Sequence, residues 1–338
     1  MKARLTGKRV PFQLNMHITD VCNLRCKYCY IDFDHAVPDM SLETMKDVIS
    51  QARACGTERI SLEGGEPLVR RDIGELVDHI ASVGIDCNIN TNGYYLPRKI
   101  GELKRVGTIS VSMDGPRDVH DALRGPGSYD KAIAAIEAAR GAGIKVHVLS
   151  VLTKANRPHV RFMVDLAKTM GFMWIPTSLF FMAGVKIDRE AAGAFKIEDE
   201  DYKALMRELI QLKAEGAPIA WSNRTLKYVR DWPTTYFQSN FFNMTEEYVM
   251  KEFKPLQCQA SRHFCVMQTN GDLYSCDPLL GYGKAQNAVE LGFKEAFERT
   301  SQNGCIACNS LVCSEYHSLF TMNVPVIMNL LTQYAKRG

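Results

Sequence analysis

Residues 20 to 30 read DVCNLRCKYCY and place Cys22, Cys26 and Cys29 in a C-x3-C-x2-C pattern. Thiolates are soft ligands that suit zinc or iron–sulfur clusters. A structural zinc ion needs four donors, and His17 and His35 flank the loop as possible fourth ligands. A four-iron cluster bound by three cysteines instead leaves one iron open to a small molecule. The pattern therefore predicts a metal centre, and it leaves open what occupies the fourth ligand position.

The sequence around this loop alternates between two periodicities from residue 12 to about residue 180. Short β-rich runs begin at Phe12, Arg59, Ile85, Thr108, Lys145 and Phe172. Amphipathic helices are expected between them, for example over 41–56, with Ser41 as the N-cap and Gly56 at the end. Segments 72–84 and 128–143 repeat that pattern, and Pro158 suits the first turn of a further helix. Six successive βα units predict parallel strands with right-handed crossovers, in either a barrel-like or an open sheet.

In both architectures a ligand binds at the carboxyl ends of the strands. The three-cysteine loop follows the first expected strand, and EGGEPL at 63–68 follows the second. NTNG at 90–93 follows the third, and SMDG at 112–115 ends the fourth. These motifs should therefore meet at one edge of the sheet. For Asn90, Thr91 and Asn92, a role in cofactor binding and a role in capping the strand both remain open.

Composition excludes several classes of protein. The chain has 338 residues, a net charge of +3 and no basic stripe, so nothing indicates nucleic-acid binding. No apolar run reaches the roughly 18 residues of a membrane span, and no signal peptide is visible, so we expect a cytoplasmic protein. Eleven cysteines, an odd number, indicate metal binding rather than disulfides. Cys55 and Cys87 stand apart in periodic segments and are expected to be small buried apolar residues.

The pattern changes after about residue 186, and we divide the chain into 1–185, 186–250 and 251–338. The middle region has a charged helix and an aromatic-rich stretch from Trp221 to Phe242, which could line a site or fill a core. The last region holds a second cysteine group. Its members are Cys258, Cys265, Cys276, Cys305, Cys308 and Cys313.

With CNLRCKYC, GGEP and SVSMDGPRDVHDALRG in place, the sequence resembles the radical S-adenosylmethionine (radical SAM) superfamily. The resemblance implies an α/β fold, a partial (β/α)6 TIM-type barrel followed by a small cysteine-rich α+β domain for an auxiliary cluster. It also implies that the first three cysteines hold a [4Fe–4S] cluster whose open iron chelates SAM. The expected SAM-binding residues are Tyr28 at the adenine, Gly64, Gly65 and Glu66 at the ammonium, Ser112 at the ribose and Arg124 at the carboxylate.

The second cysteine group resembles a SPASM domain, which carries auxiliary [4Fe–4S] clusters. GDLYSC at 271–276 matches its hairpin, and C-x2-C-x4-C from Cys305 matches part of its later run. The six cysteines are fewer than the seven or eight of the full pattern. Two clusters could form, with His317 as a candidate ligand at an incomplete corner, or one cluster could form in a shortened, twitch-like domain. We expect two, and a zinc ribbon is the alternative.

The resemblance implies an oxidoreductase or maturase that cleaves SAM reductively to a 5′-deoxyadenosyl radical and abstracts hydrogen from its substrate. We expect a small molecule, such as a sugar, nucleoside or cofactor precursor, for redox, epimerisation or bond-forming chemistry. The first strand begins near residue 12 and leaves no room before it for a leader-binding domain, so a peptide substrate would need a separate recognition partner. A flavodoxin- or ferredoxin-type protein is the expected electron donor. The alternative of another class is a non-catalytic zinc or electron-transfer protein, and no catalytic acid or base is assigned.

Overall fold

The structure is a computed structural model that describes residues 9–31, 33, 38–179, 193–236, 240–242, 253–301 and 305–335. His35, one of the two histidines considered as a zinc ligand, lies outside these residues. So does the end of the sixth expected strand, beyond residue 179.

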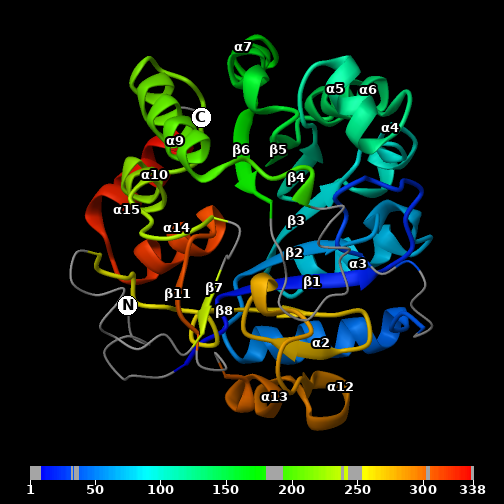
Figure 1. The fold of residues 1–338 in the computed structure, drawn as a ribbon. Coiled ribbons are helices and arrows are strands. Elements are labelled where there is room, and N and C mark those ends of the chain that lie inside the picture. The colour runs from blue at the N-terminus through cyan, green and yellow to red at the C-terminus, as the bar shows by residue number, and fades with distance from the viewer. Residues whose placement is uncertain are drawn as a thin grey trace.

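Six parallel strands form the frame of the fold, each paired with the next in chain order. They are β1 (Gln13–Thr19), β2 (Arg59–Gly64), β3 (Asp86–Thr91), β4 (Thr108–Ser112), β5 (Lys145–Leu152) and β6 (Met173–Ser178). The sheet curves, and its helices lie on the outer side (Figure 1). The predicted partial barrel is confirmed.

Helices α2 (Leu42–Ala54), α3 (Ile73–Ser82), α6 (Ser128–Gly141) and α7 (Val160–Met170) connect these strands where the sequence predicts them. Two shorter helices that the sequence analysis does not predict are α4 (Leu96–Lys99) and α5 (Arg117–Arg124). Short 3-10 turns occur at Pro67–Val69, Ile100–Glu102 and Arg157–His159, the last containing Pro158. Ser41 caps α2 as expected, because its Oγ accepts a hydrogen bond from the Thr44 backbone N at 3.1 Å.

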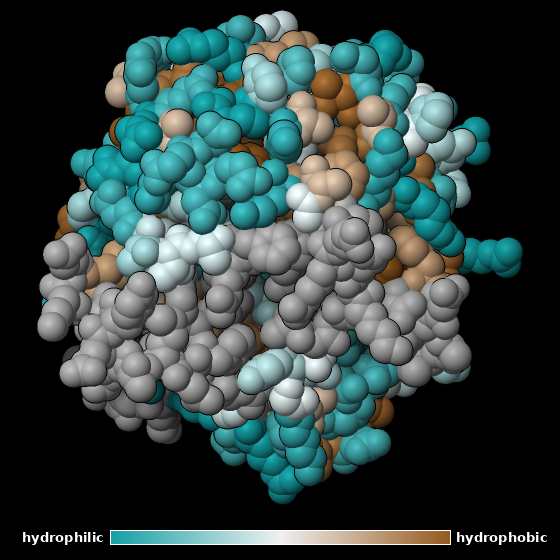
Figure 2. Space-filling model, in the orientation of Figure 1, coloured by the Kyte–Doolittle hydropathy of each residue, from teal (hydrophilic) through white to brown (hydrophobic). Residues whose placement is uncertain are grey.

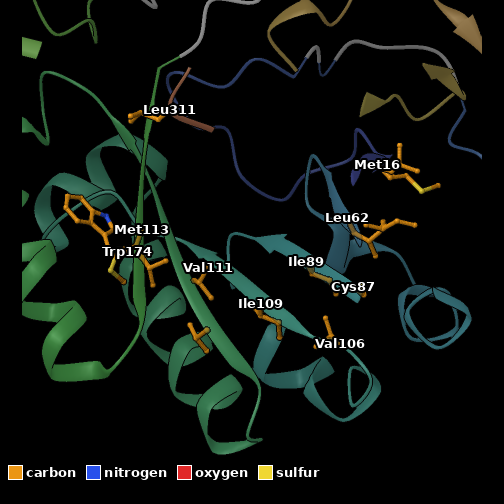
Figure 3. Close-up of a cluster of buried hydrophobic side chains, with 14 of the residues drawn as sticks. Met16, Leu62, Cys87, Ile89, Val106, Ile109, Val111, Met113, Trp174 and Leu311 are labelled. Atoms are coloured by element: carbon orange, nitrogen blue, oxygen red, sulfur yellow. The ribbon is translucent and has the colours of Figure 1, made fainter. Parts of the chain in front are cut away.

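Alternation along the strands separates a dry face from a polar one. Met16, Leu62, Ile89 and Ile109 are fully buried and belong to the core between sheet and helices (Figure 3). Cys87 lies in the same core, 1% exposed, as predicted, and Cys55 packs against it partly buried. Burying each large aliphatic side chain stabilises the fold by roughly 1.5–3 kcal/mol.

The opposite face of these strands carries polar side chains into the barrel interior. The residues on this face that line a cavity include Gln13, Asn15, Arg59, Ser61, Glu63, Asn88, Asn90, Ser110, Ser112 and His147. A barrel of this kind is usually filled by branched apolar side chains. The polar lining therefore indicates an interior built to receive a ligand.

Part of the last region continues the barrel sheet. Strand β8 (Phe264–Met267) pairs in parallel with the free edge of β1, and β9 (Asp272–Tyr274) and β10 (Gln286–Asn287) extend the sheet antiparallel. The sheet thus has nine strands in the order β10-β9-β8-β1-β2-β3-β4-β5-β6. The expected boundary near residue 251 therefore does not separate two sheets.

The remaining elements flank the barrel (Figure 1). They are α9 (Asp199–Ala214), α10 (Asn223–Arg230), β7 (Asn240–Phe242), a 3-10 turn at Asp277–Leu279, α12 (Ala288–Leu291), α13 (Phe293–Arg299), β11 (Cys305–Cys308), α14 (Leu311–Phe320) and α15 (Val324–Ala335). β7 and β11 form a separate antiparallel pair. In the aromatic stretch, Trp232 and Tyr236 are buried in the core, whereas Trp221 also lines the cavity.

The described part of the face in Figure 2 is mostly hydrophilic, with hydrophobic residues scattered between. None of the helices among the described residues combines the length and the apolar character needed to cross a membrane.

Candidate cofactor and cluster site

A cavity of about 400 Å³ lies in the barrel interior and reaches the carboxyl ends of the strands. It is bordered by the first cysteine loop at Cys22, Cys26 and Cys29, and also by Cys313 of the second group. The predicted meeting of the motifs at one edge of the sheet is thus present in the structure. Both cysteine groups face one space.

The cysteine loop is held by backbone contacts to its neighbours. The Lys27 N donates to the Leu123 carbonyl at 3.0 Å, which ties the loop to α5, and the Cys29 N donates to the Cys26 carbonyl at 3.1 Å. All three cysteines are free thiols of intermediate exposure. Burial raises the pKa of Cys29 to about 11 and also raises that of Cys22 and Cys26. Ligation must therefore displace protons from these thiols.

The donor set fits an iron–sulfur cluster. Three thiols of one loop border the cavity. The Leu24 N donates a hydrogen bond to Cys22 Sγ at 3.4 Å, and the Asn92 Nδ2 donates one to the same sulfur at 3.9 Å. His17, the described histidine of the zinc alternative, does not line this cavity, and its Nε2 faces Glu63 Oε2 at 4.0 Å. The three cysteines of the loop thus border the cavity without His17, and their role as cluster ligands stays a prediction.

Gly64 and Gly65 permit a close approach between the end of β2 and the cysteine loop. A Cβ on Gly64 would lie 2.2 Å from the Thr19 carbonyl oxygen, and a Cβ on Gly65 would lie 2.4 Å from that of Val21. Gly64 also has a φ of +131°, which favours glycine. Both glycines line the cavity. They are required for packing in addition to any contact with a ligand.

Glu66 is fully buried and does not line the cavity. Its Oε1 accepts from the Thr91 hydroxyl at 2.7 Å and from the Leu68 N at 3.0 Å, and its Oε2 accepts from the Asn92 N at 2.6 Å. Burial raises the pKa of Glu66 to about 7 against the effect of these hydrogen bonds. Glu66 thus fixes the loop after β3, and its predicted contact with the SAM ammonium stays a prediction.

Arg124 and Tyr28 share a buried partner, Asp114. The Arg124 Nε donates to Asp114 Oδ2 at 2.6 Å, and the Tyr28 hydroxyl donates to the same carboxylate. The guanidinium also lies over the Tyr28 ring, 5.6 Å from its centroid. Arg124 and Tyr28 both line the cavity, as does Ser112. The structure therefore brings together three of the predicted SAM-binding residues.

His120 and Asp121, which lie between Ser112 and Arg124, hold the neighbouring backbone in place through hydrogen bonds. The His120 Nδ1 accepts from the Asp114 N at 3.1 Å, and burial lowers the pKa of His120 to about 4, so the ring is neutral. Asp121 accepts from the Gly127 and Tyr129 backbone N atoms at 2.9 and 2.8 Å and holds the start of α6.

The second cysteine group gathers mainly at one place. Cys258, Cys276, Cys305, Cys308 and Cys313 pack in one cluster with Phe264 and Tyr316. Cys313 forms sulfur hydrogen bonds with Cys276 and Cys308, which lower its pKa and raise theirs. Five cysteines gathered in one packed set are enough for an iron–sulfur cluster with four cysteine ligands.

Cys265 differs from the prediction that it is a metal ligand. It lies in β8 between Phe264 and Val266, so the alternation of the strand turns it into the core between sheet and helices, 1% exposed. His317 lies beside the five-cysteine cluster, stacks on Phe264 with ring centroids 5.6 Å apart, and accepts from the Gln259 N through Nδ1 at 3.2 Å. That nitrogen is thereby engaged by the backbone.

Sequence reasoning missed Asp114, Glu63, Asp277 and Glu315. All four are buried or half-buried, and all but Asp114 line the cavity. Glu315 accepts from the Ser222 hydroxyl at 2.7 Å, which joins α14 to α10. Asp114 could have been found from the sequence, because an acidic residue directly after β4 lies at the edge of the sheet where ligands bind.

Comparison with known proteins decides the family of the barrel. The model of the radical SAM superfamily matches residues 16–167. The chain carries a radical SAM domain. This family uses a [4Fe–4S] cluster and SAM, which the resemblance of the sequence implied.

Similar curated proteins are radical SAM enzymes of several activities. A GTP 3′,8-cyclase of Marinobacter nauticus is 34% identical over 165 residues, which cover 46% of this chain and 50% of the relative. An AdoMet-dependent heme synthase of Methanosarcina barkeri is 29% identical over 222 residues, or 62% of each chain. A mycofactocin maturase, MftC, of Mycobacterium tuberculosis is 31% identical over 173 residues, 49% of this chain and 44% of the relative. The matches thus span about half of these relatives.

Among solved structures, SuiB of Streptococcus suis matches 90% of this chain and 69% of its own, with a TM-score of 0.67 and 19% identity. At that identity the likeness shows the fold. It extends beyond the barrel into the cysteine-rich region, which agrees with a SPASM- or twitch-type second part.

Proposed function

We propose that the protein is a SAM-cleaving radical enzyme that abstracts hydrogen from a polar small molecule bound inside the barrel. The observation that carries this proposal is that one cavity is bordered by both cysteine groups, Cys22, Cys26 and Cys29 on one side and Cys313 on the other. A substrate in that cavity lies between the two cluster sites. When bound, the cluster and SAM supply a 5′-deoxyadenosyl radical that takes a hydrogen atom from an unreactive carbon.

The residues of this chain have separable roles in the proposal. Cys22, Cys26 and Cys29 hold the SAM-binding cluster and leave its fourth position open toward the cavity. Arg124, fixed by Asp114, offers a guanidinium for the SAM carboxylate, and Ser112 offers a hydroxyl to the ribose. Tyr28 presents its ring to the adenine. Gly64 and Gly65 expose backbone groups beside the loop, where the SAM ammonium is expected.

We further propose a single auxiliary [4Fe–4S] cluster rather than the two expected from the spacing. Five cysteines at one place cannot fill two sites of four, and Cys265 packs away from them. Four of Cys258, Cys276, Cys305, Cys308 and Cys313 would hold the cluster. Cys313 lines the cavity, so a cluster that it helped to hold would border the substrate and could exchange an electron with it. A flavodoxin- or ferredoxin-type donor is proposed to reduce the SAM-binding cluster.

A small-molecule substrate is supported by the lining of the cavity. The polar side chains that the strands turn inward suit a ligand with several hydrogen-bonding groups. The second candidate is a peptide substrate delivered by a partner protein, which is favoured by the fold shared with SuiB, a protein whose structure has been solved with its precursor peptide SuiA.

The decisive experiment is anaerobic reconstitution with iron and sulfide, reduction with dithionite, and chromatographic detection of 5′-deoxyadenosine from SAM. We expect the product from the wild-type protein and none from the triple variant Cys22→Ala, Cys26→Ala, Cys29→Ala. A reconstituted wild-type protein that forms no 5′-deoxyadenosine contradicts the proposal.

A further inference from the structure

Three side chains from different parts of the chain converge beside the cavity. They are His17 of β1, Glu63 of β2 and Asp277, which follows β9. One ligand atom from each lies within 4.8 Å of the other two, and His17 Nε2 is 4.0 Å from Glu63 Oε2. Glu63 and Asp277 line the cavity, whereas His17 is only 2% exposed. None of the three has a role in the proposed binding of SAM.

The hydrogen-bond donors among the described residues satisfy the acceptor atoms of these three side chains only in part. His17 Nε2 is buried without a hydrogen-bond partner in the described structure. Burial lowers the pKa of His17 to about 4, so the ring is neutral at physiological pH and can accept a proton donor. Among the described residues, no lysine or arginine forms an ion pair with Glu63 or Asp277. Burial and the nearby Asp277 raise the pKa of Glu63 to about 8, so this carboxyl group is ionised at neutral pH only beside a cation. The three side chains therefore favour a cationic ligand with hydrogen-bond donors.

Amide side chains fix the orientation of both carboxylates. The Asn90 Nδ2 donates to Glu63 Oε1 at 2.9 Å, and the Asn15 Nδ2 donates to Asp277 Oδ2 at 2.9 Å. One oxygen of each carboxylate is thereby held in place. For Glu63 the other oxygen, Oε2, is the one that faces His17. Such supporting hydrogen bonds are typical of a built binding site.

The spacing of the acceptors distinguishes a primary ammonium group from a metal ion. An ammonium with three hydrogen bonds of about 2.8 Å in tetrahedral directions holds its acceptors about 4.6 Å apart. A transition metal with bonds of about 2.1 Å holds neighbouring ligand atoms only about 3.0–3.4 Å apart. His17 Nε2 and Glu63 Oε2 are 4.0 Å apart, wider than the spacing around a bound transition metal, and all three ligand atoms lie within 4.8 Å of one another, a limit that admits the ammonium.

We propose that His17, Glu63 and Asp277 bind a primary ammonium group of the substrate, so that the substrate class is a primary amine. This inference rests on the proposed function, because it places the amine in the cavity between the two cluster sites. The three N–H bonds of the ammonium are directed to the imidazole nitrogen and to one oxygen of each carboxylate. The charge of the ammonium offsets the two carboxylates that lack a basic partner.

The test uses three probes of the same length: n-butylammonium, n-butanol and n-butyltrimethylammonium. The second lacks the charge, and the third keeps the charge but has no N–H donor. Binding to the anaerobic holoprotein with SAM bound is measured by ligand-observed NMR. We compare the wild type with Glu63→Gln and with Glu75→Gln, an equivalent change at a side chain that is 70% exposed. Iron content and melting temperature report whether each variant is folded and loaded.

We expect n-butylammonium to bind the wild type and Glu75→Gln about tenfold more tightly than either other probe, as charge-assisted hydrogen bonds predict. Glu63→Gln should remove that preference. Equal binding of the three probes, no binding, or a preference that survives Glu63→Gln overturns the inference. Stoichiometric binding of Mn²⁺, seen by EPR and lost in Glu63→Gln, overturns it in favour of a metal site. Formation of 5′-deoxyadenosine is scored separately, so failure of the proposed function is distinguishable.

Discussion

Arg124 at the end of α5 and Asp114 just after β4 form a buried ion pair, with the Arg124 Nε 2.6 Å from Asp114 Oδ2. Their side chains are 8% and 0% exposed. The pair sets the position of the guanidinium at the cavity wall and anchors the Tyr28 hydroxyl through the same carboxylate. The SAM-binding role proposed for Arg124 therefore depends on an acid that does not line the cavity.

Asp114→Asn should destabilise the protein by about 3–5 kcal/mol, because it leaves a buried guanidinium without its counter-charge. Urea unfolding of the wild type and the variant measures the difference. The control is Asp130→Asn, which removes the carboxylate of the exposed Arg117–Asp130 pair and should leave the unfolding free energy nearly unchanged. Equal effects of the two changes would show that burial of the Arg124–Asp114 pair does not matter.

Gly64→Ala should destabilise the end of β2 by about 1–3 kcal/mol or more, since the new methyl would meet the Thr19 carbonyl oxygen at 2.2 Å. Loss of iron after reconstitution should accompany it, because the cysteine loop must move away. Gly141→Ala is the control: it lies at the end of α6 with no atom within 4 Å of the new Cβ. Melting temperature and iron content are the two measurements.

The triple variant Cys276→Ala, Cys308→Ala, Cys313→Ala leaves two cysteines at the second site and should lower the iron and sulfide content toward that of one cluster. Cys265→Ala should keep the wild-type content of about eight irons. The reason is that Cys276 contacts Cys313 in the five-cysteine cluster and Cys265 lies in the core. Chemical iron and sulfide assays give both numbers. About twelve irons in the wild type, or iron loss on removing Cys265, would contradict a single auxiliary cluster.

His120→Asn should make stability less sensitive to acid. In the folded protein burial lowers the pKa of His120 to about 4, below the 6.5 of an unperturbed histidine. The unfolded chain thus binds more protons between pH 6.5 and 4, and His120 reduces stability by up to about 1.4 kcal/mol per pH unit as the pH falls through this range. The asparagine Oδ1 replaces the acceptor for the Asp114 N. Urea unfolding at pH 7 and pH 5 should show the smaller loss in the variant, and parallel losses would refute the assignment.

The strands, the helices and the convergence of the motifs could be predicted because local signals agreed with one another. Each local signal indicates one kind of element: apolar alternation a strand, the Ser41 cap the start of a helix, and the terminal glycines the end of one. The parallel βα topology then determines which strand ends meet. The order of β1 to β6 follows from that rule. The cysteine loop could be placed for the same reason.

The position of Cys265 could not be predicted, because spacing between cysteines does not reveal which face of a strand each one occupies. Phe264 and Cys265 point to opposite sides of β8, and a shift of one residue would exchange them. The His17–Glu63–Asp277 cluster could not be predicted either, because the pairing of β1 with both β2 and β8 brings its members together. Long-range register of this kind has no local signal.

The pairing of β8 with β1 bears on how the protein is made. Gln13 pairs with Arg59 on one side and with Phe264 on the other, so one edge of β1 stays open on the ribosome until most of the chain has emerged. An exposed parallel edge of this kind invites pairing with other chains, and contacts so distant in sequence form slowly. Expression with slowed translation or with chaperones should therefore raise the yield of native protein.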